Sequence, residues 1–202
     1  MADSGGHGLH AKPWVKTRPA GAAEHPAGTS SGRTQSAILV PVPAAEDVVG
    51  PLRRRLDPVA TAGVPAHITL IVPWVPPWKI EEHHLHALAD ALDDVHPFDF
   101  ELTETGWFGE RVLWLAPRPV EPFLAMTARL AHRFATPPWA GEFKEVVPHL
   151  TVGHSTGDPA ELRRVAAELA PQLPIAGRAE EVWVMSGDGI RWKVRAKVTL
   201  GV

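Results

Sequence analysis

Residues 66–74 read AHITLIVPW and residues 148–154 read PHLTVGH. Each stretch holds a histidine followed two positions later by a threonine, His67 with Thr69 and His149 with Thr151. Short apolar, β-branched runs bounded by proline or glycine predict buried strands. Because side chains alternate between the two faces of a strand, the histidine and threonine of each motif should share one face. The residue between them should point into the core.

Two imidazoles and two hydroxyls on polar strand faces suit the cleavage of a phosphodiester. One imidazole accepts a proton from the attacking water or hydroxyl, and the other donates a proton to the departing oxygen. Histidine, with an ordinary pKa of about 6.5, serves either purpose near neutral pH. The threonine hydroxyls would bind nonbridging phosphate oxygens. We assign His149 as the base and His67 as the acid, although the residues leave this order open, and the scheme requires no metal.

Composition narrows the class of protein. The chain has 202 residues, 45% of them hydrophobic, which is enough for one core and one domain. Residues 1–35, rich in Gly, Pro, Ala and Ser, predict a disordered tail, and residues 36–202 predict the folded domain. A net charge of −3 lacks the positive field that nonspecific duplex binding needs. The absence of cysteine excludes thiolate and Cys-zinc chemistry.

The same sequence bears on location and assembly. No run approaches the roughly 20 apolar residues that cross a bilayer, and no signal peptide is evident. We therefore expect a cytoplasmic protein without a membrane partner, a monomer with no obligate protein partner.

Periodicity predicts an α+β fold of two similar lobes, each with antiparallel strands and outer helices. Each half offers a helix, a strand with a His-x-Thr motif, a second helix and a further strand. The expected strands are residues 37–43, 67–72, 98–104 and 111–116, the second motif strand, and a terminal hairpin around the turn SGDG at 186–189. The expected helices are residues 45–56, 79–95, 121–134 and 158–170, the last with Asp158 as N-cap.

The two motifs, together with FELTETGWFGERVLWL at residues 100–115, resemble the two-histidine (2H) phosphoesterases. That family includes 2′-5′ RNA ligase-like proteins and cyclic nucleotide phosphodiesterases. The resemblance implies a bilobal fold with a central cleft, and His67, Thr69, His149 and Thr151 as catalytic residues. It also implies cofactor-free, metal-independent action on an RNA 2′,3′-cyclic phosphate, a 2′-5′ linkage or a related small cyclic nucleotide phosphate.

Substrate-binding residues are predicted from the same reasoning. Because the chain has no tyrosine, an aromatic residue that stacks on a base must be Trp or Phe. The candidates are Trp74, Trp107 and Phe108. Strict alternation puts three basic residues on one face, where they would form a rim for an RNA strand. These are Arg191, Lys193 and Arg195.

Two other functions stay open at this point. One is a non-catalytic RNA-end or nucleotide-binding module that uses the same cleft. The other is a zinc hydrolase, because His83, His86 and Asp90 share a helix face at ligand-like spacing. An exposed, hydrated helix surface explains those three residues equally well.

Two further features are assigned no catalytic role. His154 lies five residues after His149, an odd offset that predicts the opposite face of a continuous strand. Residues 53–55, three consecutive arginines, are interpreted as a solvated helix face.

Overall fold

The computed structural model describes residues 34–141, 145–155 and 159–201. The predicted tail lies outside this range except for residues 34 and 35, which belong to the first strand. The predicted N-cap Asp158 also lies outside the described residues.

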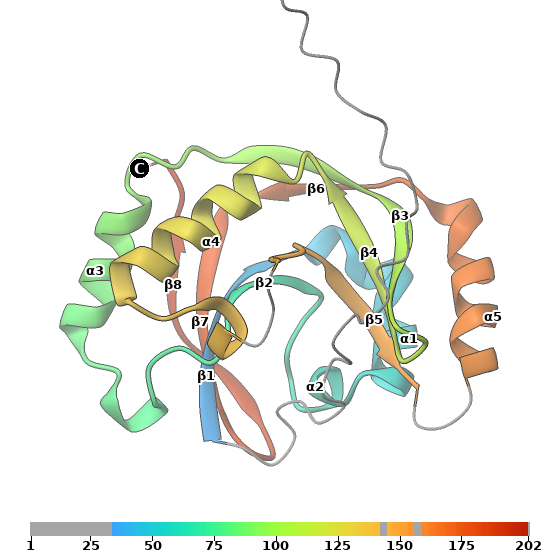
Figure 1. Cartoon of the computed structure of the whole chain (residues 1–202), viewed down its shortest axis with the longest axis horizontal. Coiled ribbons are helices and arrows are strands. Elements are labelled where there is room, and N and C mark those ends of the chain that lie inside the picture. The colour runs from blue at the N-terminus through green and yellow to red at the C-terminus, as the bar shows by residue number, and fades with distance from the viewer. Residues whose placement is uncertain (1–33, 142–144, 156–158, 202) are drawn as a thin grey trace, which may run out of the picture.

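The described strands form one eight-stranded sheet in the order β6-β3-β4-β5-β2-β1-β7-β8. Every pairing is antiparallel, and the sheet curls on itself (Figure 1). The strands are β1 (Thr34–Pro41), β2 (His67–Ile71), β3 (Phe98–Phe108), β4 (Val112–Arg118), β5 (Leu150–His154), β6 (Ile175–Ala179), β7 (Glu181–Asp188) and β8 (Trp192–Thr199).

The sheet divides into two matching halves at its centre. One half runs β2-β1-β7-β8 outward, and the other runs β5-β4-β3-β6. The two motif strands, β2 and β5, are the adjacent central pair. This arrangement confirms the predicted α+β fold with two similar lobes.

Two helices pack against the half of the sheet to which their preceding strand does not belong. The helices are α1 (Glu46–Leu56), α2 (Pro58–Thr61), α3 (Glu82–Leu92), α4 (Glu121–Phe134) and α5 (Pro159–Leu169), with short 3-10 turns at Pro43–Ala45, Pro77–Lys79, Pro138–Gly141 and Ala170–Gln172. Helix α1 follows β1 but contacts β5, and α4 follows β4 but contacts β2. Helices α3 and α4 lie on one side of the molecule, and α1 and α5 on the other (Figure 1). Each central strand is thus covered by a helix from the other half.

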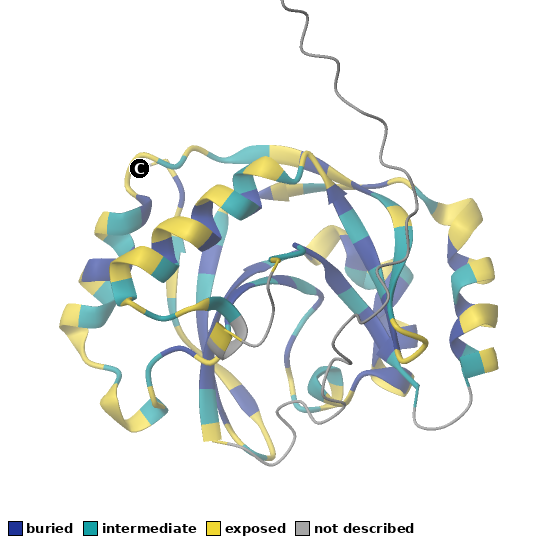
Figure 2. Cartoon of the chain, viewed as in Figure 1, coloured by how far each residue is buried: buried dark blue, intermediate teal, exposed yellow. Residues whose placement is uncertain are grey.

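The main core lies between these helices and one face of the sheet. It joins Ile68 and Leu150 of the central strands to apolar residues of the helices, such as Leu52, Leu88 and Phe123. In Figure 2 the buried residues concentrate on the inner strands and on the sheet-facing sides of the helices. A second, smaller apolar cluster is separate from this main core and includes Leu39, Val64, Met185 and Trp192. The face of β2 and β5 that points away from the main core is left to the motif side chains.

Most predicted elements are confirmed, with ends that differ by a few residues. Strand β5 begins at Leu150, so His149 lies immediately before the strand. Strand β6 and helix α2 are not predicted, because IAGRA offers only two buried apolar side chains and α2 is a single turn. Among the described residues, no helix has the length and apolar character needed to cross a membrane.

Candidate active site

The pairing of the two central strands brings the motifs together. Ile68 is the partner of Leu150 in an antiparallel pair, and both residues are fully buried in the main core. In this register His67 lies opposite Thr151, and Thr69 opposite His149. Side chains at such positions have Cβ atoms about 4.5–5.5 Å apart. All four polar side chains therefore share the face that points away from the main core, which we call the motif face.

Each motif histidine is held in the same way. His67 Nδ1 lies 2.8 Å from the carbonyl oxygen of Pro65, and His149 Nδ1 lies 2.6 Å from that of Val147. A carbonyl oxygen only accepts hydrogen bonds, so Nδ1 donates its proton in both rings. In a neutral ring Nε2 then carries the lone pair. Nε2 is therefore the atom through which each imidazole transfers a proton.

The environment of His67 favours the neutral imidazole. Burial lowers the pKa of His67 from its ordinary 6.5 to about 3, assisted by the positive charge of Arg53 and by His149. The hydrogen bond with Pro65 opposes this shift, but only in part. His67 is accordingly neutral at physiological pH and able to accept a proton.

Two aromatic rings pack beside His149. The Phe108 ring meets the His149 ring edge-on with centroids 4.8 Å apart, and the Trp114 ring lies 5.8 Å from it. Phe108 and Trp114 also contact each other at 5.2 Å. The register explains their position, because Trp114 pairs with Thr151 on one side and with Gly106 on the other. Phe108 was predicted from the sequence, whereas Trp114 was missed.

Gly106 makes room for this aromatic pair. A Cβ atom at Gly106 would lie 2.2 Å from Cη2 of Trp114, well inside van der Waals contact. The indole can therefore lie against β3 only because position 106 has no side chain.

The other two predicted stacking residues lie elsewhere. Trp107 pairs with Leu113, which is buried in the main core, and Trp107 itself packs against that core. Trp74 is 6% exposed within the same core, with its ring 5.2 Å from that of Phe134. Neither ring therefore lies beside the motif histidines, where a base bound at the motifs could stack on it. A strand places neighbouring residues on opposite faces, and Phe108 rather than Trp107 faces the motifs.

The predicted basic rim is also wrong. Strand β8 is an edge strand, separated from β2 by β1 and β7. Lys193 pairs with Ser186, which pairs with Ser36. Ser36 shares a face with Ile38 of the main core, so Lys193 points away from the motif face.

The neighbours of Lys193 do not form a shared face with it. Arg195 is the extra residue of a β-bulge, because Ala196 pairs with Val184 and Val194 with Met185. Arg191 precedes β8 and donates its backbone N–H to Asp188 Oδ1 at 2.8 Å. The bulge breaks the strict alternation on which the prediction rested.

A second bulge corrects the placement of His154. Trp114 pairs with Thr151 and Leu113 with Gly153, which leaves Val152 as the extra residue of β5. His154 therefore returns to the face of Thr151. Consistently, a Cβ at Gly153 would point at α1, 2.5 Å from Leu56 Cβ.

His154 contacts a buried carboxylate. Its Nε2 lies 3.9 Å from Asp57 Oδ1. Burial lowers the pKa of His154, and the charge of Asp57 opposes that shift.

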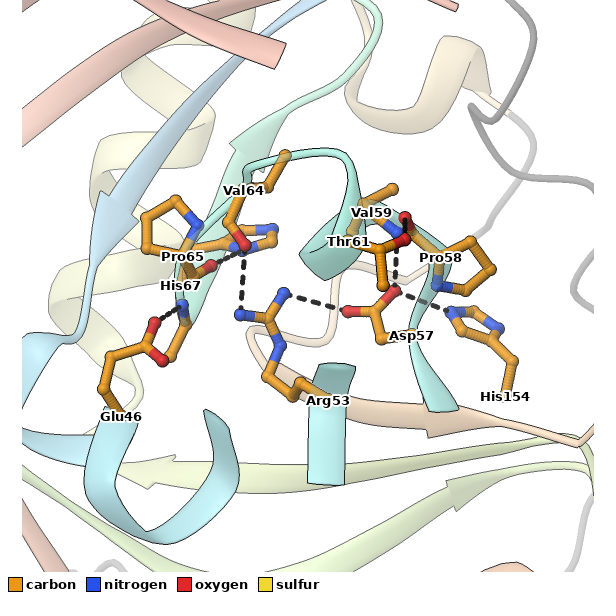
Figure 3. Close-up of polar contacts among 11 residues, drawn as sticks. Glu46, Arg53, Asp57, Pro58, Val59, Thr61, Val64, Pro65, His67 and His154 are labelled. Carbon is orange, nitrogen blue, oxygen red and sulfur yellow. Dashed lines mark hydrogen bonds and ion pairs between the residues drawn. The ribbon is translucent and has the colours of Figure 1, made fainter. Parts of the chain in front are cut away.

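Arg53 is buried, contrary to the predicted solvated helix face. It is 1% exposed, and it forms an ion pair with Asp57 at 2.9 Å (Figure 3). Its Nη1 also donates to the carbonyl oxygen of Val64 at 3.3 Å. Arg54 and Arg55 are exposed as predicted.

The histidine cluster on α3 does not support a zinc site. His83 and His86 are largely exposed and lie beside Glu81 and Glu82 respectively. In the part of the chain that the structure describes, no group of three or more His, Asp or Glu side chains is placed to hold a metal ion.

Replacing Gly106 by alanine tests the aromatic pair. Away from a clash, Gly→Ala commonly stabilises a protein by about 0.4–1 kcal/mol. Here the overlap with Trp114 should reverse the sign and destabilise by about 1–3 kcal/mol, as measured by urea unfolding. In a Trp114→Ala background the same Gly106→Ala change should cost nothing. A stabilised single variant would contradict this packing.

The lowered pKa of His67 predicts acid sensitivity. As the pH falls from about 6.5 toward 3, the unfolded chain binds a proton at this residue and the folded chain does not. The free energy of unfolding should therefore fall by up to about 1.4 kcal/mol per pH unit. In His67→Asn this part of the slope should disappear between pH 6.5 and 4, whereas exposed His86→Asn should retain it. Equal slopes in wild type and His67→Asn would refute the assignment.

Comparisons with solved structures agree with this fold. A crystal structure of TT0787 of Thermus thermophilus matches with a TM-score of 0.57 at 20% identity, over 82% of this chain and 97% of that chain. A crystal structure of a phosphoesterase matches with a TM-score of 0.51 at 19% identity, over 84% and 100%. Escherichia coli LigT complexed with NADP+ matches with a TM-score of 0.50 at 18% identity, over 85% and 100%. At these identities the likeness concerns the fold alone.

The sequence itself identifies the family. No curated protein matches the chain. The model of the 2′-5′ RNA ligase superfamily, however, matches residues 40–191, which include both motifs. The chain therefore belongs to the 2′-5′ RNA ligase superfamily of two-histidine phosphoesterases.

Proposed function

We propose that the chain is a metal-independent phosphodiesterase that acts on an RNA 2′,3′-cyclic phosphate, a 2′-5′ linkage or a related small cyclic nucleotide phosphate. The observation that carries the proposal is the pairing of Ile68 with Leu150, which gathers two imidazoles and two threonine hydroxyls on one face. Membership in a phosphoesterase superfamily supports the reaction class. The NADP+ complex of E. coli LigT supports a phosphate-bearing nucleotide as the ligand class.

The proposed reaction uses the two histidines in different roles. For a cyclic phosphate, His67 Nε2 removes a proton from the attacking water as the water oxygen bonds to phosphorus. His149 Nε2 donates a proton to the ribose oxygen as its bond to phosphorus breaks, and the product is a phosphomonoester. Thr69 and Thr151 hold the nonbridging oxygens, where charge must be stabilised. Because burial keeps His67 neutral, its Nε2 is able to accept a proton, so we take His67 as the base, the reverse of the order assigned from the sequence.

We assign the aromatic pair, Phe108 and Trp114, as the binding site for the nucleobase of the substrate. Phe108 and Trp114 lie beside His149 on the motif face, so a base attached to the ribose can stack there while the phosphate lies between the histidines.

Removing either imidazole should abolish turnover. His67→Ala and His149→Ala should each lower kcat on a nucleoside 2′,3′-cyclic phosphate by at least about 10²-fold, measured by chromatography of the product. Circular dichroism should show an intact fold, and exposed His86→Ala should behave as wild type. Excess EDTA should leave the rate of the wild-type enzyme unchanged.

Two other outcomes would revise the proposal. Full activity in either variant would end the two-histidine mechanism. Binding of a cyclic phosphate by the wild-type protein, with no product over a panel of cyclic phosphates and 2′-5′ linkages, would indicate the non-catalytic binding module.

Replacing the Phe108 ring with an aliphatic side chain tests whether this residue stacks on the nucleobase of the substrate. Loss of one base-stacking contact, about 1–3 kcal/mol, should raise KM for a nucleoside cyclic phosphate by roughly 5- to 150-fold in Phe108→Leu. KM for ribose 2′,3′-cyclic phosphate, which has no base, should stay the same. Trp107→Leu on the opposite face is the matched control and should not raise KM. A similar increase for both substrates in Phe108→Leu would reject stacking.

A further inference from the structure

Arg53 is a buried charge that the proposed chemistry does not use. Its side chain and that of Asp57 are each 1% exposed, so both charges are withdrawn from water. Burying an arginine is costly unless its charge and its donors find partners. Asp57 accepts one hydrogen bond from Arg53 and Val64 accepts another, whereas Arg53 Nε has no partner among the described atoms. Because burying this ion pair costs free energy, we looked for a role of Arg53 other than stabilising the fold.

The hydrogen bonds of α1 hold the segment that orients His67. Val64, whose carbonyl accepts from Arg53, immediately precedes Pro65, and the carbonyl of Pro65 accepts from His67 Nδ1. On the other side of Pro65, the backbone N–H of Ala66 donates to Glu46 Oε1. Two side chains of α1 thus fix the backbone on either side of the carbonyl that sets the His67 ring (Figure 3).

The two charges of the ion pair lie on different sides, one toward His67 and one toward His154. In Figure 3 the guanidinium of Arg53 lies on the side of His67, and the carboxylate of Asp57 lies beyond it, toward His154. The groups whose charge acts on His67 are Arg53 from α1 and His149 from the segment before β5. After burial, the charge of Arg53 is the largest influence that lowers the pKa of His67.

We propose that the buried Arg53–Asp57 ion pair is the positioning element for His67: it fixes the backbone next to the carbonyl that orients the ring, and it places its positive end on the side of that ring. This inference rests on the proposed function in one respect only, the assignment of His67 as proton acceptor. Arg53 is a positioning residue, because it acts through His67 and not on the substrate.

The first test measures the ring of His67 directly and needs no substrate. The NMR titration midpoint of the His67 ring is compared in wild type and in Arg53→Met/Asp57→Leu, which removes both buried charges together. The midpoint should rise by about one to two pH units in the double variant. Arg54→Met, the same change on the exposed face of α1, should leave it unchanged, and Arg53→Lys, which retains the charge, should keep it low.

The second test separates a positioning role from a purely structural one. On a nucleoside 2′,3′-cyclic phosphate, the acid limb of kcat/KM should move upward in the double variant by the same amount as the ring midpoint, with little change in KM. If the double variant does not fold, Arg53→Gln, which is neutral but can still donate to Asp57, replaces it in both measurements. An unchanged midpoint in the folded variant would overturn the inference. If wild type has no activity, the proposed function fails, and the ring titration still decides the role of Arg53.

Discussion

The antiparallel pairing of Ile68 with Leu150 is the constraint on which the rest of the site depends. Both side chains are fully buried under helices, so the register of β2 against β5 is fixed by the hydrophobic core. A slip of one residue would turn these apolar side chains toward the motif face and the histidines into the core. The packing that stabilises the fold is therefore the same packing that brings two distant His-x-Thr motifs to one face of the sheet.

The scaffold is nearly symmetric, but the surroundings of the two histidines are not. The halves share their strand order and the hydrogen bond from Nδ1 to the carbonyl two residues earlier. The buried Arg53–Asp57 pair, however, lies near His67, whereas the rings of Phe108 and Trp114 pack beside His149. Enzymes assign acid and base roles to like residues through such differences in environment. In this chain the asymmetry supports a neutral His67 and a substrate base on the side of His149.

The sequence was sufficient for most of the elements and for the motifs, but not for β6, for α2 or for features that depend on strand partners. Alternation within AHITLIVPW and PHLTVGH predicted the shared face of each His and Thr pair, and apolar periodicity predicted α1 and α3. Trp114 could not be found in this way, because its position beside the motifs follows from its pairing with Thr151. The bulges at Val152 and Arg195 likewise leave no local signal, and they reversed the predicted faces of His154 and of part of β8.

The burial of Arg53, in contrast, could have been predicted from the sequence. Val49, Leu52 and Leu56 form the buried stripe of α1, and position 53 falls within that stripe at helical spacing. A charge within an apolar stripe predicts a buried, paired arginine more readily than a solvated one. The run of three arginines obscured this, although only Arg54 and Arg55 are exposed.

The most direct test of the central claim is whether both imidazoles bind the same phosphate. Histidine ring signals, assigned with His67→Asn and His149→Asn, are followed by NMR while a nucleoside 2′-monophosphate is added. The account predicts that the His67 and His149 signals shift together along one binding curve, while exposed His86 does not respond. Movement of only one motif ring, or two curves with different midpoints, would contradict it.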